Sequence, residues 1–394
     1  MIKKSNPMLI LILTIGVFSI LNTEMGVIGL LPSIAEHFAI SISQAGLTVS
    51  LFAIAIAVSG PITPLLLSGI DRKKVMLVVL GVFIVGNVLS VFVSNFALLL
   101  GIRVVLGLFH PVYCSMAFTA AAASVSKEEA PKAVSKVFIG VSAGMVAGVP
   151  IASFIDSIAS YETAMAFFAL VSGIVFAATW ILVPSMPVAG EKGSYGSQLS
   201  VLKTPLIWIS IVTVILLNAS VFGVYSYISD YLGSVTRMSP GSISLTLFVF
   251  GAANIIGNLV AGKLLSGQAM KWVILFPAAM IAVYAALFVL GGYVLPTTLI
   301  TFVWGILAGG IMANINQYLI SSAAPDAPEF ANGLFIASCN VGTTVGSAVG
   351  GVLIAGMGIQ HVVWVGVVAL ALGLVTIMLR SFVSSHIVRA AEAG

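Results

Sequence analysis

The chain has 394 residues, of which 60% are hydrophobic and only 7% are charged, against roughly 25% in a typical soluble domain. Its 16 basic and 12 acidic side chains are too few to cover a soluble fold of this length, so lipid must surround most of the exterior. The formal net charge of +4 is small and calls for no nucleic-acid partner.

The first apolar run, residues 8–31, follows Lys3 and Lys4 and superficially resembles a signal peptide. It is longer than the roughly 7–15 residues of a signal-peptide core, and no small-residue cleavage site follows it. A membrane-spanning helix needs about 20 apolar residues. We therefore interpret this run as the first transmembrane helix, retained in the protein.

Eleven further apolar runs follow, and the longest polar stretch, residues 184–204, separates the first six runs from the last six. The predicted spans are residues 8–31, 43–67, 75–93, 97–123, 134–156, 163–183, 205–230, 240–262, 272–291, 297–321, 331–355 and 362–380. The sequence predicts an all-α membrane protein with twelve transmembrane helices. We expect an N-terminal six-helix bundle (1–183), a cytoplasmic linker (184–204) and a C-terminal six-helix bundle (205–394).

The basic residues predict the topology, because cytoplasmic loops retain Lys and Arg. With the amino terminus inside, fourteen of the sixteen basic residues lie on the cytoplasmic side, whereas Arg237 lies outside and Arg103 lies within a helix. The fourteen are Lys3, Lys4, Arg72, Lys73, Lys74, Lys127, Lys132, Lys136, Lys192, Lys203, Lys263, Lys271, Arg380 and Arg389. Both termini are therefore expected in the cytoplasm.

The two halves also repeat each other at a constant offset of 198 residues. The matching pairs are Phe52 with Phe250, Gly107 with Gly305, Gly144 with Gly342, Gly148 with Gly346, and the tetrapeptide 66–69 with 264–267. Two six-helix pseudo-repeats indicate a transporter whose site lies between them near the membrane midplane.

Ionisable groups inside a membrane are costly and are functional candidates by default. Glu24 lies in the first predicted helix, and Arg103 and His110 lie in the fourth. At 1.5 Å per residue, Glu24 is about 12 Å and Arg103 about 10 Å below the outer surface, so an ion pair between them is feasible. His110 follows Arg103 by two turns on the same face. A purely structural Glu–Arg pair and a packing histidine remain alternatives.

Uncharged polar residues form stripes on two helices of the second half. Asn218 and Tyr225 lie two turns apart, and Asn314, Gln317 and Ser321 share one face. Such stripes either line a water-filled cavity or join helices; we favour cavity lining here. For Asn87, Asn254, Asn258 and Asn340, which lie on other helices, joining is the better interpretation.

Gly144 and Gly148 follow Gly140 at four-residue spacing and precede Pro150, a pattern that tight helix packing explains fully. The sequence has no phosphate-binding loop and no metal-ligand cluster, so we expect no enzyme activity, no cofactor and no bound metal. Cys114 and Cys339 lie in apolar runs and are interpreted as packing residues.

Several of these residues resemble the drug–proton antiporter branch of the major facilitator superfamily, with the closest likeness to bacterial sugar efflux transporters and then to purine-efflux permeases. Asn22-Thr23-Glu24 resembles the first-helix signature, whose carboxylate is implicated in proton coupling. Arg103 with Gly107 resembles the fourth-helix motif, and His110 matches the sugar-efflux variant. Gly144, Gly148 and Pro150 resemble the antiporter motif of the fifth helix, which implies export. Matches also occur at 225–227 and 324–326.

The loop between the second and third helices departs from the superfamily pattern. Arg72 and Lys73 supply the usual basic cluster, but Ser68 stands where an aspartate is expected, and Asp71 is displaced. We assign a gating or packing role to Asp71, Arg72 and Lys73 and to the fifth-helix residues Gly144, Gly148 and Pro150.

The resemblance implies a proton-coupled exporter of sugars, nucleosides or amphipathic drugs that works by alternating access in the bacterial inner membrane. Glu24, Arg103 and His110 are the expected proton-coupling residues. Asn22, Asn218, Tyr225, Asn314 and Gln317 are expected in the substrate cavity. The expected partners are a small-molecule substrate, protons and the lipid bilayer, with no nucleic acid, and the protein is expected to be a monomer. A proton-coupled importer on the same fold and a non-transporting receptor or intramembrane enzyme are the alternatives.

Overall fold

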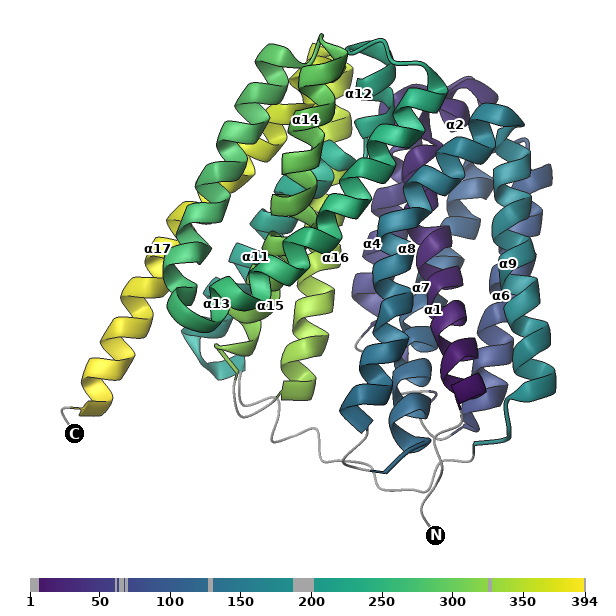
Figure 1. Cartoon of the computed structure of the whole chain (residues 1–394), viewed down its shortest axis with the longest axis horizontal. Coiled ribbons are helices and arrows are strands. Elements are labelled where there is room, and N and C mark those ends of the chain that lie inside the picture. The colour runs from purple at the N-terminus through teal and green to yellow at the C-terminus, as the bar shows by residue number, and fades with distance from the viewer. Residues whose placement is uncertain are drawn as a thin grey trace. The chain divides into compact units, whose positions relative to one another are not determined.

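The computed structural model describes residues 7–60, 62–63, 67, 70–126, 130–186, 202–324 and 328–392 (Figure 1). This part of the chain contains helices and no strands. Twelve of its segments are long and apolar enough to cross a membrane, which confirms the predicted all-α architecture. Large apolar side chains are widely exposed, including Phe92 at 80% and Ile181 at 73%, as expected where lipid is the solvent.

The chain divides into two compact units. The first unit comprises Met1–Glu191 and Ser239–Phe248, and the second comprises Lys192–Met238 and Val249–Gly394. Residues 187–201, which form most of the expected linker and include Lys192, lie outside the described residues, as do Ser68 and residues 325–327. The domain boundaries predicted from the sequence therefore remain a prediction.

The helices of the first unit form the purple to teal part of Figure 1. They are α1 (Pro7–Gly29), α2 (Leu31–His37), α3 (Ile42–Ala45), α4 (Leu47–Ser59), α6 (Arg72–Phe92), α7 (Phe96–Ala123), α8 (Ala130–Ile158) and α9 (Tyr161–Leu182). Helix α1 makes its most extensive contact with α8, and it also touches α4, α7 and α9. Polar caps start several helices: Asn95 accepts hydrogen bonds from the first amides of α7, and Ser160 accepts one in α9.

The remaining helices run from teal to yellow in Figure 1 and belong to the second unit, except for residues 240–248, which belong to the first. They are α11 (Pro205–Tyr225), α12 (Ile228–Ser234), α13 (Pro240–Leu290), α14 (Val294–Trp304), the π-helical η2 (Gly305–Ile311), α15 (Met312–Ser321), α16 (Pro328–Met357), η3 (Ile359–Val362) and α17 (Val363–Glu392). The single element α13 contains two spans, Pro240–Ala261 and Ala269–Leu290, and its ribbon reverses direction between them (Figure 1). Helix α11 packs against α15, α16 and α17.

One helix contact recurs in both units at the 198-residue offset. A Cβ atom on Gly107 of α7 would lie only 2.7 Å from the carbonyl oxygen of Phe52 on α4. A Cβ atom on Gly305, at the start of η2, would likewise overlap the carbonyl oxygen of Phe250 on α13. In each unit a glycine therefore allows the main chains of two helices to approach closely, so the sequence repeat corresponds to a repeated packing contact.

Local features differ from the predicted elements in both units. The first helix ends at Gly29, before the end of the predicted span 8–31, and Pro32 lies in the first turn of the separate helix α2. Proline suits that position because its missing N–H would be unpaired there in any case. The predicted tenth helix is interrupted by η2, a π-helical segment that hydrophobic periodicity does not reveal.

Candidate functional site

Three helices of the first unit bring the predicted ionisable residues together. Arg103 and His110 lie two turns apart on α7, and both contact the ring of Phe52 on α4. The guanidinium carbon of Arg103 is 4.1 Å from the Phe52 ring centroid, and the imidazole centroid of His110 is 6.0 Å from it in an edge-on arrangement. Gly107 lies between the two on α7 and allows this close approach of α4.

The carboxylate of Glu24 contacts His110. Glu24 Oε2 lies 2.9 Å from His110 Nε2, and the two side chains are only 14% and 10% exposed. This is an ion-pair distance without the alignment of a well-directed hydrogen bond. The other ring nitrogen, Nδ1, has no hydrogen-bond partner among the residues that the structure describes. A carboxylate and an imidazole are thus in contact within the spanning helices and nearly enclosed by protein, a position where ionisable groups are costly and are functional candidates.

The direct ion pair between Glu24 and Arg103, which their similar depths made feasible, does not form in the structure, where the Glu24 carboxylate contacts His110. Arg103 is 3% exposed, and its guanidinium donates to main-chain carbonyls instead: Nη1 to Thr23 at 3.0 Å, Nη2 to Glu24 at 3.5 Å and Nε to Thr48 at 3.3 Å. The reason is the geometry of the planar guanidinium group, whose N–H donors point in fixed directions and reach carbonyl oxygens of α1 and α4. The Glu24 carboxylate reaches His110, two turns farther along α7. Arg103 thus ties three helices together beside Glu24.

Asn22 also lies on α1, two residues before Glu24. It was expected to line a cavity, but it is fully buried, and neither its amide oxygen nor its amide nitrogen has a partner within the described residues. A neighbouring hydrogen bond agrees with the interpretation of Asn87 as a residue that joins helices. Asn87 Nδ2 of α6 donates to Thr23 Oγ1 of α1 at 3.3 Å. Asn87 therefore joins α6 to α1, as a helix-joining asparagine should.

The glycines of α8 face α1, the helix that carries Glu24. A Cβ on Gly144 would lie 3.3 Å from the carbonyl oxygen of Phe18 and would overlap the Cβ of Leu21. A Cβ on Gly148 would lie 3.2 Å from the Cβ of Met25. The close helix packing predicted from the four-residue spacing is therefore present. Pro150 lies within the same helix, α8. A gating role for this segment stays a prediction.

Two of the polar residues expected to line a cavity in the second unit join helices. Asn218 Nδ2 donates to the carbonyl of Cys339 at 2.5 Å and to Thr343 Oγ1 at 2.9 Å. Asn314 Nδ2 donates to Asn258 Oδ1 at 2.7 Å and to the main chain of η2. The side-chain amides of Asn218 and Asn314 therefore already donate hydrogen bonds to neighbouring helices. Gln317 on α15 is exposed. Tyr225 is buried in a cluster of aromatic rings.

The displaced Asp71 joins two helix ends of the first unit. It caps α6, which begins at Arg72, and accepts hydrogen bonds from Ser185 Oγ at 2.6 Å and the Met186 amide at 2.8 Å. Lys73 Nζ donates to a carbonyl near the end of α9 at 2.8 Å. Burial raises the pKa of Asp71, but the hydrogen bonds from Ser185 and the amides outweigh it and lower the pKa below 3.8.

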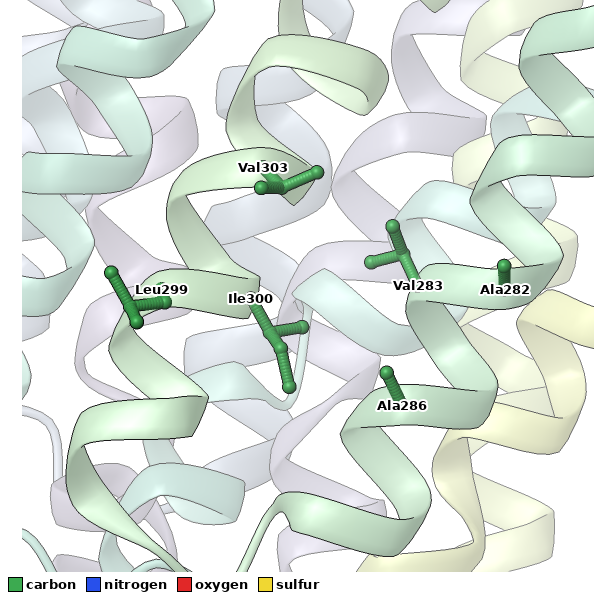
Figure 2. A pocket seen from close by; sticks show the side chains of 6 residues that line it. All are labelled: Ala282, Val283, Ala286, Leu299, Ile300 and Val303. Atoms are coloured by element: carbon green, nitrogen blue, oxygen red, sulfur yellow. The ribbon is translucent and has the colours of Figure 1, made fainter.

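The described residues contain no group of three or more His, Cys, Asp or Glu side chains that could hold a metal. Cys114 and Cys339 are free thiols. A pocket of about 330 Å³ lies between α13 and α14, and Figure 2 shows its apolar side chains. Its lining consists of Ala282, Val283, Ala286, Leu299, Ile300 and Val303. It offers no polar group to a solute and is not the candidate site.

Sequence reasoning missed the contribution of α4 to the site. Phe52 and the carbonyl of Thr48 both contact Arg103, yet neither was singled out as a site residue. A signal was available, because Phe52 and Gly107 both recur at the 198-residue offset. Two residues that recur together on different helices indicate the same packing contact in each half.

The family model of the Major Facilitator Superfamily matches residues 13–336, and the chain belongs to this superfamily of membrane transporters. The chain is 31% identical to the uncharacterized MFS-type transporter YtbD of Bacillus subtilis, over 92% of this chain and 93% of that protein. It is 28% identical to the inner membrane transport protein YdhP of Escherichia coli, over 94% and 95%. It is 26% identical to a probable sugar efflux transporter of Helicobacter pylori, over 96% and 95%.

Two solved structures share the fold. A mutant of the nucleoside transporter NupG superposes with a TM-score of 0.78 at 14% identity, covering 94% of this chain and 99% of that one. A bacterial homologue of the human lysosomal transporter Spinster, in an inward-facing and unoccupied conformation, gives 0.79 at 15% identity, covering 96% and 98%. The protein is accordingly a multi-pass membrane transporter and not an enzyme.

Proposed function

We propose that this protein is a proton-coupled antiporter that exports a small solute, such as a sugar, a nucleoside or an amphipathic drug, by alternating access. The observation that carries the proposal is the contact of 2.9 Å between Glu24 and His110. It joins an acidic side chain within the first candidate span, Pro7–Gly29, to an imidazole on a neighbouring helix. Ionisable groups at such depth mark proton relays in transporters.

The charges around the pair suit a proton that is bound and released in turn. When the proton leaves, the negative charge of Glu24 stays beside the positive charge of Arg103, which is fixed by its bonds to α1 and α4. When the proton binds, the contact with His110 is rearranged. We infer that protonation occurs while the site faces the acidic outside, and that the proton leaves toward the cytoplasm as solute binds.

The proton gradient is sufficient to drive export. An elementary charge that crosses a potential of 100 mV releases about 2.3 kcal/mol. Since 1.4 kcal/mol corresponds to a factor of ten, one proton could sustain a solute gradient of roughly fortyfold. One proton per solute molecule is therefore enough for useful accumulation against a gradient.

Export, rather than import, is supported by two features. The α8 glycines and Pro150 resemble an antiporter motif, and the relatives from Helicobacter pylori carry the name of probable sugar efflux transporters. The relative from Escherichia coli is named an inner membrane transport protein, and we propose the same location here, with both termini in the cytoplasm and Gly144, Gly148 and Pro150 in a gating helix.

The test replaces Glu24 with Gln in purified protein reconstituted into proteoliposomes. Glu24→Gln keeps the shape of the protonated side chain but cannot release a proton. We expect accumulation of a radiolabelled sugar or nucleoside driven by an imposed pH gradient to fall to the level of empty liposomes. Solute exchange without a gradient should persist. Glu36→Gln, on the exposed surface of α2, is the matched control and should behave like the wild type.

If Glu24→Gln still accumulates solute against its gradient at the expense of the pH gradient, Glu24 is not the coupling residue. His110→Gln then becomes the decisive variant. If neither variant abolishes coupling, the pair carries no proton and the proposal fails.

A further inference from the structure

The short helix α2 lies at one end of the first unit (Figure 1). It follows α1, the helix that carries Glu24, and the predicted topology places it on the outer side of the membrane. Two of its polar side chains reach other helices. Ser33 Oγ donates to Asp156 Oδ2 of α8 at 2.5 Å. His37 Nδ1 lies 3.2 Å from Glu162 Oε1 of α9. Helix α2 is therefore attached to the ends of two spanning helices.

The contact between His37 and Glu162 is open to solvent, because the two side chains are 30% and 41% exposed. Glu162 lies in the first turn of α9, where the helix dipole stabilises a negative charge. Imidazole is the side chain whose charge changes between pH 5 and 8, so the two groups form an ion pair while His37 is protonated. The pair is therefore present at acidic pH and is lost as the pH rises.

Two further carboxylates lie around this pair. Glu36 precedes His37 on α2, and Asp156 lies within electrostatic range of both Glu36 and Glu162. Helices α1 and α3 also contact α2; α3 contains no titratable residue, and Glu24 is the only one in α1. Within the described residues, His37 is the only ion-pair partner of these three outer carboxylates. The charge of His37 therefore decides whether α2 is held electrostatically.

Tyr161, at the start of α9, joins His37 to the interior of the unit. Its ring centroid lies 5.0 Å from that of the imidazole, and its side chain is buried. Its hydroxyl donates to the carbonyl of Ser90 at 3.3 Å and lies within electrostatic range of Arg103. Arg103 in turn donates to main-chain carbonyls of α1 beside the Glu24 carboxylate. A series of interactions thus runs from α2 to the candidate site.

The chain leaves α2 through a residue in an unfavourable backbone conformation. Ala39 has a φ of 51°, in the left-handed region that residues other than glycine seldom adopt. Such a conformation persists where the surrounding structure holds it. Here Phe38 packs edge-on against Tyr161 at 6.2 Å, and the capping box at Ser41 fixes the start of α3. Loss of the His37 ion pair removes one of the contacts that hold this strained segment in place.

We propose that α2 is a pH-sensitive latch on the outer end of the first unit. Protonated His37 holds α2 against the start of α9 through Glu162, and loss of the proton lets α2 move and the backbone at Ala39 relax. The proton on His37 is not transported. Acidic medium outside, which supplies the coupled proton, also fixes the outer end of α1. The inference rests on the proposed function, because the latch regulates the site around Glu24.

Hydrogen–deuterium exchange of the peptide that contains α2 tests the latch in the purified full-length protein, without solute or pH gradient. Exchange is compared at about pH 5 and about pH 8, the limits of histidine titration, and corrected for the intrinsic effect of pH. We expect the protection of α2 to fall about threefold, the effect of one exposed ion pair. His37→Gln should lack this fall. His361→Gln, whose imidazole contacts the Met357 carbonyl in the second unit, is the matched control and should retain it.

A second variant tests whether His37 and Glu162 act as a pair. Glu162→Gln should remove the same pH response, and the double variant should add nothing, because the two side chains share one interaction. A response that survives in His37→Gln, or that only one of the two single variants removes, overturns the latch.

The regulatory role is measured in proteoliposomes with a radiolabelled sugar or nucleoside at a constant pH difference. Raising the external pH from about 5 to about 8 should slow transport about threefold less in His37→Gln than in the wild type. Equal sensitivity overturns the regulation. The proposed function is tested separately, because coupling depends on Glu24. If Glu24→Gln retains coupling while α2 keeps its response through His37, the antiporter mechanism fails and the latch stands.

Discussion

At the residue scale, Arg103 has a role that its charge alone does not describe. Its three donor bonds reach carbonyls on two other helices, and its guanidinium lies over the Phe52 ring. A lysine would keep the positive charge but has one compact ammonium group that cannot span these acceptors. A substitution that preserves the charge can therefore test whether Arg103 acts only through its positive charge or also by connecting three helices.

We expect Arg103→Lys to destabilise the protein by about 2–3 kcal/mol, the order expected for losing hydrogen bonds to a charged group. Transport should fall by more than about tenfold, because α1 and Glu24 lose their fixed position. Thermal unfolding in detergent and uptake in proteoliposomes measure the two effects. The same substitution at the exposed Arg237 is the control. A stable and active Arg103→Lys protein would show that charge alone suffices.

At the element scale, the contact between α1 and α8 depends on glycine. The absent side chain of Gly144 is what allows α1 to approach, whereas Gly173 on α9 has no atom within 4 Å of its Cβ position. Replacing either glycine with alanine brings the same gain in helix propensity, about 1 kcal/mol. Any difference between the two variants therefore reports on the helix contact.

We expect Gly144→Ala to lower stability by about 1–3 kcal/mol through overpacking and to reduce transport, because α1 is displaced. Gly173→Ala should be neutral or slightly stabilising. Thermal unfolding of the two purified variants side by side provides the comparison. If Gly144→Ala is as stable as Gly173→Ala, α1 and α8 do not pack as closely as the structure has them.

At the scale of the whole molecule, the distribution of basic residues makes a prediction about topology. Single cysteines at Lys192, Lys263 and Arg237, in a chain whose Cys114 and Cys339 are replaced by alanine, can be labelled with a membrane-impermeant thiol reagent. Cytoplasmic loops retain positive charge, so position 237 should react in intact cells, and positions 192 and 263 only after the membrane is opened. Labelling of 192 and 263 on opposite sides would contradict twelve spans with both termini inside.

Apolar runs and the scarcity of charged residues were sufficient to predict that the protein lies in a membrane and crosses it twelve times. Those properties follow from local quantities: the length of an apolar run against the thickness of a bilayer, and the scarcity of charge. The same local reading singled out Glu24, Arg103 and His110, because ionisable residues within apolar runs are few. It also predicted that Arg103 and His110 share a face of one helix, since a spacing of seven residues is two turns.

Which side chains contact one another follows from the packing of the helices, and the sequence did not predict it. Matching depths made Glu24 and Arg103 plausible partners, but the carboxylate contacts His110 and the guanidinium contacts main-chain carbonyls. Periodicity within one helix fixes which residues share a face, and leaves open how that face is rotated and shifted against the next helix. That relation depends on packing between helices distant in sequence, such as the contact of Gly107 with Phe52. The aromatic cluster around Tyr225 was hidden for the same reason, because its rings come from three helices.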